Sequence, residues 1–243
     1  MSEEQLDPEF LDIDPLSPAY REAVTENRAL VESLSAHSTA LLVIDVQYLD
    51  AAPGYGVFAD ADRSGVPHEA QLYYFDRLQS TVLPNIRRLQ DAFRAKGLEV
   101  IHTRIQSLTH DGRDRGAGHR RLGLHAAPGS KEAEFLPEVA PIGDEIVINK
   151  TASGVFNATN VEYILRNLGI TGLFVVGVYT NECVSTTARD ACDRGFFVTL
   201  VDDACATVTP ELHSATIRTL RDRYCRVLDT EAAIDEINKV VKP

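Results

Sequence analysis

Residues 173–192, with the sequence LFVVGVYTNECVSTTARDAC, decide how this chain folds. The apolar residues 173–176 predict a buried strand, which bends at Gly177 and leads into a polar stretch that is compatible with a helix. Cys183 should then lie at or near the start of that helix, where unpaired N–H groups and the positive end of the helix dipole stabilise a thiolate. The pattern indicates a nucleophile site. A thiol that only packs in the strand–helix junction is the alternative for any single cysteine.

The same alternation of strand and helix extends along most of the chain. Apolar runs predict strands at residues 39–46, 98–103, 146–148, 173–176, 196–201 and 225–228. Helical stretches separate most of them, including 70–96, 161–168, 211–224 and 230–240. Longer loops are expected at 47–68, whose Gly, Pro and aromatic content suits a lid or pocket wall, and at 105–131. This order predicts an α/β fold with a parallel sheet and helices on both faces.

The chain divides into an N-terminal extension and one domain. Residues 1–38 are acidic and interrupted by proline, and they contain a predicted amphipathic helix at 18–34. Such a helix covers either its own domain or a neighbouring subunit, and the sequence does not decide between them. Residues 39–243 are enough for a single α/β domain, given the 44% hydrophobic content of the chain.

Charge and hydropathy exclude several classes of partner. The formal net charge of −12 argues against nucleic acid, which requires a basic surface. One local exception is the arginine run at positions 113, 115, 120 and 121, which is either a solvated loop or a loop that holds an anionic group. No apolar run approaches the roughly 20 residues of a membrane span, so no membrane partner is expected. The acidic N-terminus does not resemble a signal peptide.

The cysteines and the phosphate-binding motifs give further expectations. The four cysteines form no CxxC pair and show no zinc-ligand spacing, which indicates a reducing compartment and favours the cytoplasm. Neither GxGxxG nor a P-loop sequence is present, so a nucleotide cofactor has no motif to support it.

Three chemically complementary residues stand at the predicted ends of strands. Asp45 lies near the end of the first strand, Lys150 follows the strand at 146–148, and Cys183 follows the strand at 173–176. Because a parallel sheet places the carboxyl ends of its strands at one edge, these side chains can meet there. A carboxylate can accept the thiol proton, and an ammonium can stabilise the thiolate.

The sequences around these residues resemble a known family. VIDVQ around Asp45, INK ending at Lys150 with SGVFNATN after it, and GVYTNECVSTTARDACDRG around Cys183 are similar to the isochorismatase-like cysteine hydrolases. The resemblance covers residues 39–228. It implies a Rossmann-like three-layer αβα fold with a parallel sheet of about six strands, and a catalytic triad of Cys183, Asp45 and Lys150.

The resemblance also implies a mechanism. A cis peptide bond before Tyr179 would aim the N–H of Tyr179, with that of Cys183, at the oxyanion that forms when the thiolate attacks a carbonyl. The chemistry would be acyl transfer through a thioester, with ammonia or an amine as the leaving group. Members of the family often form dimers or tetramers, so a homo-oligomer is expected.

Substrate preference differs among members of the family. The run from HTR at 102–104, through the Cys183 motif, to DDACAT at 202–207 most resembles the biuret and ureide amidohydrolases, which favours a small carboxamide or ureido substrate (biuret, ureidoacrylate or a carbamoyl amine). The alternatives are hydrolysis of nicotinamide or a vinyl ether, and a non-catalytic scaffold protein. Residues 102–111 lack the DxH arrangement of the nicotinamidase branch, so neither a metal nor another cofactor is expected.

Further residues are candidates for contact with the substrate. Arg104 could bind a carboxylate or ureide oxygen, or it could be a surface arginine. Aromatic residues could wall the pocket or belong to the core, and Asn157 could orient the substrate or cap a helix; the aromatic candidates are Tyr48, Tyr55, Phe58 and Phe156. The sequence does not decide whether the loop at 110–125 closes over the pocket.

Overall fold

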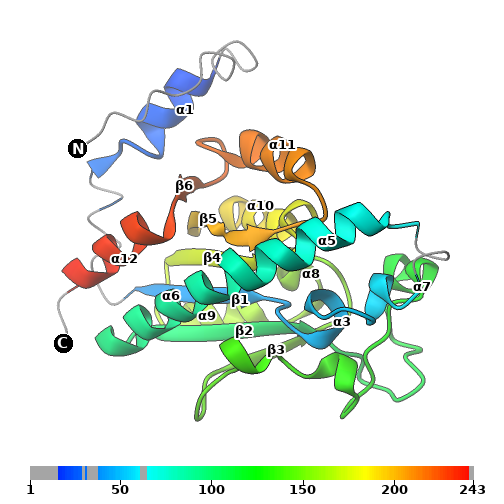
Figure 1. Ribbon diagram of the computed structural model, residues 1–243. Helices are drawn as coiled ribbons and strands as arrows, with labels where there is room; N and C mark the ends of the chain where they lie inside the picture. The colour runs from blue at the N-terminus through cyan, green and yellow to red at the C-terminus, as the bar shows by residue number, and fades with distance from the viewer. Residues whose placement is uncertain (1–15, 29–30, 32–37, 61–64, 241–243) are drawn as a thin grey trace.

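Strand β1 (Thr39–Ile44) lies inside a six-stranded parallel sheet in a computed structural model that describes residues 16–28, 31, 38–60 and 65–240. The strand order is β3-β2-β1-β4-β5-β6, and every neighbouring pair is parallel (Figure 1). The other strands are β2 (Glu99–Ile105), β3 (Val147–Lys150), β4 (Gly172–Val178), β5 (Phe197–Ala206) and β6 (Arg226–Leu228). The predicted parallel α/β sheet is confirmed.

Helices cover both faces of this sheet. Alternate residues of β1 face opposite sides, so Leu41 and Val43 pack in one hydrophobic cluster and Leu42 and Ile44 in the other. Helices α5 (His68–Arg77), α6 (Leu83–Lys96) and α12 (Thr230–Lys239) contribute to the first cluster. Helices α8 (Val155–Ala158), α9 (Val161–Asn167), α10 (Ser185–Asp193) and α11 (Pro210–Leu220) contribute to the second. These layers, visible in Figure 1, confirm the three-layer αβα arrangement.

Several boundaries differ from the predicted ones. The helix predicted at 70–96 consists of α5 and α6 joined by a π-helical turn, η3 (Leu78–Val82), and it ends at Gly97, which adopts the left-handed conformation. The two predicted loops contain short helices, α3 (Tyr48–Ala51), η2 (Gly56–Phe58) and α7 (Ala117–Leu122). Strand β5 continues past residue 201, because Cys205 and Ala206 pair with the end of β4 after a shift in register.

The N-terminal helix predicted at 18–34 is interrupted by a turn, and residues 28 and 31 are helical again. Helix α1 (Ser17–Ala23) is followed by a turn, and part of the predicted range, 29–30 and 32–34, lies outside the described residues. Arg21 forms an ion pair with Asp222 at 3.8 Å, and Thr25 also donates a hydrogen bond to Asp222. None of the α1 residues is buried, so this contact with the domain is peripheral. Within the described residues, no helix has the length and hydropathy of a membrane span.

Strands β4 and β1 pack closely at Gly177, and a substitution there tests this contact. The φ of Gly177 is +119°, and an added Cβ would lie 2.1 Å from the main-chain oxygen of Ile44. We expect Gly177→Ala to lower the free energy of unfolding by about 4 kcal/mol or more, since both the backbone conformation and the sheet contact are lost. Urea unfolding followed by circular dichroism measures this change.

Gly169 provides a matched control for that substitution. It also has a positive φ, +70°, but nothing lies within 4 Å of an added Cβ. We expect Gly169→Ala to cost only about 1 kcal/mol, the strain of a left-handed alanine. Equal losses in the two variants would contradict the steric role assigned to Gly177.

His102 makes the stability of the fold depend on pH. It lies fully buried in β2, with Nε2 3.2 Å from Glu145 Oε2, and burial lowers its pKa to about 4. As the pH falls below about 6.5, His102 therefore takes up a proton in the unfolded chain, whereas in the folded protein it stays neutral until about pH 4. We expect the contribution of His102 to the unfolding free energy to fall by about 2–3 kcal/mol between about pH 7 and pH 4.5. His102→Gln should make the unfolding free energy less pH-dependent over this range, and an unchanged dependence would contradict the prediction.

Candidate active site

The strand order reverses between β1 and β4, and this reversal locates the candidate site. From β1 the sheet continues to β2 and β3 on one side, and from β4 to β5 and β6 on the other. In open α/β sheets such a switch point forms a crevice outside the carboxyl ends of the strands. Asp45 directly follows β1, Cys183 lies in the π-helical turn η6 (Thr180–Val184) after β4, and Lys150 ends β3.

The side chains of these three residues meet. Lys150 Nζ lies 2.7 Å from Asp45 Oδ2 and 3.5 Å from Cys183 Sγ. Strand β2 separates β1 from β3, and the long lysine side chain spans this separation. The exposed fractions are 0% for Asp45, 1% for Lys150 and 4% for Cys183. The arrangement brings together a proton acceptor, a cation and a nucleophile.

The two carboxylate oxygens of Asp45 have different surroundings. Oδ1 accepts a hydrogen bond of 2.9 Å from Thr103 Oγ1, near the end of β2. Oδ2 faces the ammonium of Lys150, and within the described residues no hydrogen bond of regular geometry reaches it. The residue has a left-handed φ of 53°, which aspartate tolerates better than most residues. Oδ2 is therefore the oxygen best placed to accept a proton.

The environment of Cys183 favours the protonated thiol. Burial raises the pKa of Cys183 well above its usual range; the positive charge of Lys150 opposes this rise, and Asp45 adds to it. The sequence led us to expect that the helix start would stabilise a thiolate. Because burial instead raises the pKa of Cys183, the thiol needs a base in order to become a nucleophile.

Lys150 is held as a cation beside the thiol. Burial acts to lower the pKa of Lys150, but the negative charge of Asp45 raises it above its ordinary value. Its Nζ also donates a hydrogen bond of 2.9 Å to the main-chain oxygen of Ala152. The ammonium group is therefore fixed in position and in charge.

Tyr179 shapes the turn that carries the nucleophile. The Val178–Tyr179 peptide bond is cis, as the resemblance implied. The main-chain oxygen of Tyr179 accepts hydrogen bonds from the N–H groups of Glu182 and Val184, at 3.1 and 3.2 Å. The proposed use of the Tyr179 and Cys183 N–H groups as an oxyanion hole stays a prediction.

A buried histidine supports the same turn, and sequence reasoning did not find this role. His213 is a buried residue of α11. Its Nδ1 lies 2.9 Å from Thr180 Oγ1 and its Nε2 lies 2.7 Å from Asp202 Oδ1. This chain of hydrogen bonds fixes the first residue of η6 to β5 and α11. The positions of Thr180, Asp202 and His213 in the sequence follow no motif from which this hydrogen-bond chain could be predicted.

A pocket of about 220 Å³ opens onto Cys183. Much of its wall is apolar and includes Val57, Ile105, Leu122, Leu124, Val208 and Leu212. Its polar lining includes Asp50, His119, Tyr179, Asn181, Glu182 and Thr207. A small pocket with a few polar groups beside a nucleophile suits a small molecule.

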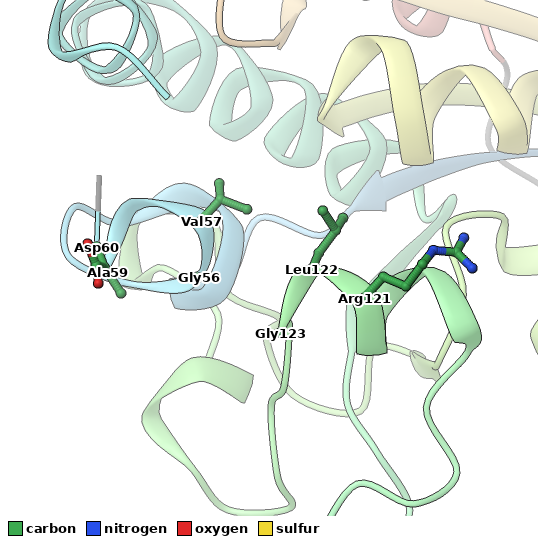
Figure 2. Close-up of a pocket in the computed structure, with 7 residues that line it drawn as sticks. All are labelled: Gly56, Val57, Ala59, Asp60, Arg121, Leu122 and Gly123. Carbon is green, nitrogen blue, oxygen red and sulfur yellow. The ribbon is translucent and has the colours of Figure 1, made fainter. Parts of the chain in front are cut away.

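The segment after β2 forms part of the wall of this pocket. His119 and Leu122 from α7, and Leu124 just after it, line the pocket, so the loop at 110–125 contributes part of its wall. A second pocket of about 310 Å³ shares Val57 and Leu122 with the first, so the two adjoin. Figure 2 shows this outer pocket, in which the side chain of Arg121 extends away from Val57.

Two arginines of this segment have structural partners. Arg115 donates hydrogen bonds to the main-chain oxygens of Gly112 and Leu124, at 2.9 and 2.7 Å. Arg113 pairs with Asp111 at 3.1 Å on the surface. Both contacts support the solvated-loop interpretation for this part of the arginine run.

The aromatic residues predicted to wall the pocket lie elsewhere. None of the four is part of the lining of the pocket at Cys183. Tyr48 and Tyr55 contact each other edge to face, and Lys131 Nζ lies 3.9 Å from the centre of the Tyr48 ring. Phe58 and Phe156 are buried in the two hydrophobic clusters. Burial of Phe58 and Phe156 in these clusters removes their apolar surface from water, which stabilises the fold.

Arg104 and Asn157 also lie outside that lining. Arg104 is part of β2, and it donates hydrogen bonds to Asn149 Oδ1 at 2.7 Å and to the main-chain oxygen of Ala133 at 3.0 Å. Asn157 donates to Asp190 Oδ2 at 2.9 Å, and it does not cap α9, whose N-cap position is Asn160. Strand alternation turns Arg104 away from the pocket, because its neighbour Ile105 lines it.

Within the described ranges, no group of three or more His, Cys, Asp or Glu side chains has an arrangement that could hold a metal ion. His102, the first histidine of the segment considered for a metal, is instead enclosed in β2 beside Glu145.

The chain is similar to known proteins of one family. The model of the isochorismatase domain matches residues 39–232. A ureidoacrylate amidohydrolase, RutB, from Acinetobacter baylyi is 30% identical over 83% of this chain and 84% of its own length. Nicotinamidase 3 from Arabidopsis thaliana is 30% identical over 65% of this chain and 80% of its own length.

A solved structure supports the fold independently. The cysteine hydrolase from Pseudomonas syringae pv. phaseolicola 1448A superposes with a TM-score of 0.70, covering 84% of this chain and 94% of that chain at 22% identity. This likeness shows the shared fold, and the family model together with the 30% identical relative shows that the chain belongs to the isochorismatase family of hydrolases.

Proposed function

We propose that this hydrolase cleaves a C–N bond of a small carboxamide or ureido compound and releases ammonia, through a thioester on Cys183. The observation that carries the proposal is the contact of Lys150 Nζ with both Asp45 Oδ2 and Cys183 Sγ inside a buried site. The similarity to a ureidoacrylate amidohydrolase and to a nicotinamidase supports the same class of reaction, because both relatives are named for C–N bond hydrolysis.

The first half of the reaction forms the thioester. Asp45 Oδ2 takes the proton of the Cys183 thiol as the sulfur attacks the carbonyl carbon, and the electron pair of the C=O bond moves to oxygen. When the tetrahedral intermediate collapses, the C–N bond breaks and Asp45 returns the proton to the nitrogen. Ammonia leaves, and the acyl group remains on sulfur.

The second half restores the enzyme. Asp45 accepts a proton from a water molecule as the water oxygen attacks the thioester carbonyl, and the C–S bond then breaks. The proton returns to Cys183, and the product acid departs. Lys150 stays charged throughout, so it stabilises the thiolate and keeps Asp45 oriented.

A cysteine substitution tests the identity of the nucleophile. We expect Cys183→Ser to lower kcat/KM for ammonia release by about 10⁴-fold or more, because the less acidic hydroxyl cannot be activated by the same carboxylate. The substrate panel should contain biuret, simple alkylureas and nicotinamide. Cys192→Ser, which replaces a half-buried thiol near the C-terminal end of α10, is the matched control and should retain activity. Unchanged turnover in Cys183→Ser would show that another residue carries the reaction.

A second substitution tests the base. Asp45→Asn keeps the shape of the side chain and removes the proton acceptor, so we expect kcat to fall by about 10²–10⁴-fold. The same change leaves the Lys150 ammonium buried without its counterion, and it should lower the unfolding free energy by about 3–5 kcal/mol. Circular dichroism confirms folding before kinetics are measured. A folded variant with the kcat of the native enzyme would refute the role of Asp45.

A further inference from the structure

Two buried polar side chains line the pocket at Cys183 and have no part in the proposed chemistry. Asp50 and His119 are 3% and 5% exposed. Within the described residues, Asp50 Oδ2 and His119 Nδ1 have no hydrogen-bond partner. Because an unpaired buried polar atom is costly to stability, such atoms beside an active site suggest a ligand that pairs with them.

The position of Asp50 is well defined. It lies in the short helix α3, five residues after Asp45, and its main-chain oxygen accepts hydrogen bonds from the hydroxyl groups of Tyr74 and Tyr179, at 2.8 and 3.0 Å. These two tyrosines fix the backbone, while the carboxyl group has no protein partner at Oδ2. The residue is therefore held in place without its carboxyl group being used for support.

The surroundings of both side chains favour their uncharged forms. Burial raises the pKa of Asp50 well above its usual range, and the nearby charge of Asp45 adds to this effect. Burial lowers the pKa of His119, and the positive charge of Lys150 contributes. A protonated carboxyl group and a neutral imidazole can each donate and accept hydrogen bonds.

The rest of the pocket offers little to a negatively charged ligand. Among the described residues that line it, none is lysine or arginine, and Glu182 adds a second carboxyl group. The nearby Arg121 belongs to the outer pocket, and its side chain points away from the shared wall at Val57 (Figure 2). A substrate carboxylate would lose its hydration here, and the nearest cation, Lys150, is already paired with Asp45 at 2.7 Å.

We infer that Asp50 and His119 form a recognition subsite beside Cys183, which pairs with the N–H and C=O groups of an uncharged carboxamide or ureide and disfavours substrates that carry a carboxylate. The inference rests on the proposed amidohydrolase function and narrows its substrate class. It distinguishes this chain from its relative that acts on ureidoacrylate, since that compound bears a carboxylate.

Three ureas of matched length test the charge preference. The probes are propylurea, which is neutral, 3-ureidopropionate, which is anionic, and 3-aminopropylurea, which is cationic. Ammonia release gives kcat/KM for each probe. We expect propylurea to exceed 3-ureidopropionate by about 30-fold or more, equivalent to about 2 kcal/mol, and also to exceed 3-aminopropylurea. A preference for either charged urea overturns the inference, even if Cys183-dependent ammonia release upholds the proposed function.

Two substitutions of similar size test the role of Asp50. Asp50→Leu removes the hydrogen-bonding group, and we expect kcat/KM for propylurea to fall by about 10–100-fold, mainly through KM. Asp50→Asn keeps a neutral donor and acceptor, so it should stay within about tenfold of the native enzyme. Asp50→Leu should also raise the midpoint of thermal unfolding by a few degrees, since it replaces an unpaired buried carboxyl group. Native kinetics in Asp50→Leu would overturn the inference, as would a lower midpoint, the sign of a merely structural role.

If none of the ureas is hydrolysed, a binding measurement tests the subsite instead. Calorimetric titration of Cys183→Ala protein with the same probes measures recognition without turnover. Tighter binding of propylurea than of 3-ureidopropionate, weakened by Asp50→Leu, would support the subsite although ureide hydrolysis had failed. Equal binding of the two probes, or binding of neither, would overturn the subsite.

Discussion

The buried ion pair between Lys150 and Asp45 is the interaction on which the site depends. Removing two charges from water is costly, and the cost is offset only where the geometry is good and the remaining polar groups are satisfied. Here the two groups lie 2.7 Å apart, Thr103 donates to Asp45, and Ala152 accepts from Lys150. The pair joins the ends of β1 and β3, and through Cys183 it reaches the turn after β4.

The same pair also acts on the Cys183 thiol. Burial favours a protonated Cys183, whereas the ammonium of Lys150 favours the thiolate. In the proposed mechanism, transfer of the thiol proton to Asp45 produces the nucleophile. A fully solvated thiol would need no such neighbour, but it would also lack the enclosed environment in which electrostatic stabilisation is strong.

The strand ends and the loops contribute different parts of the site. The strand ends position Asp45 and Lys150, while the walls of the pocket come from the segments after β1, β2, β4 and β5, including α3, η2, α7 and η6. Loops on a rigid scaffold commonly carry specificity in this way. Asp50 and His119 belong to the segments after β1 and β2, so the proposed recognition of a neutral substrate comes from side chains outside the strands.

The sequence by itself determined the parallel sheet, its six strands and the meeting of Asp45, Lys150 and Cys183, because strand periodicity is local and parallel strands share one carboxyl edge. Only the tertiary structure decided the composition of the pocket. Arg104 and the aromatic candidates contact other partners, whereas Asp50, His119 and the Thr180–His213–Asp202 chain became visible only in three dimensions. The pocket is assembled from segments far apart in the chain, and their contacts leave no periodic pattern in the sequence.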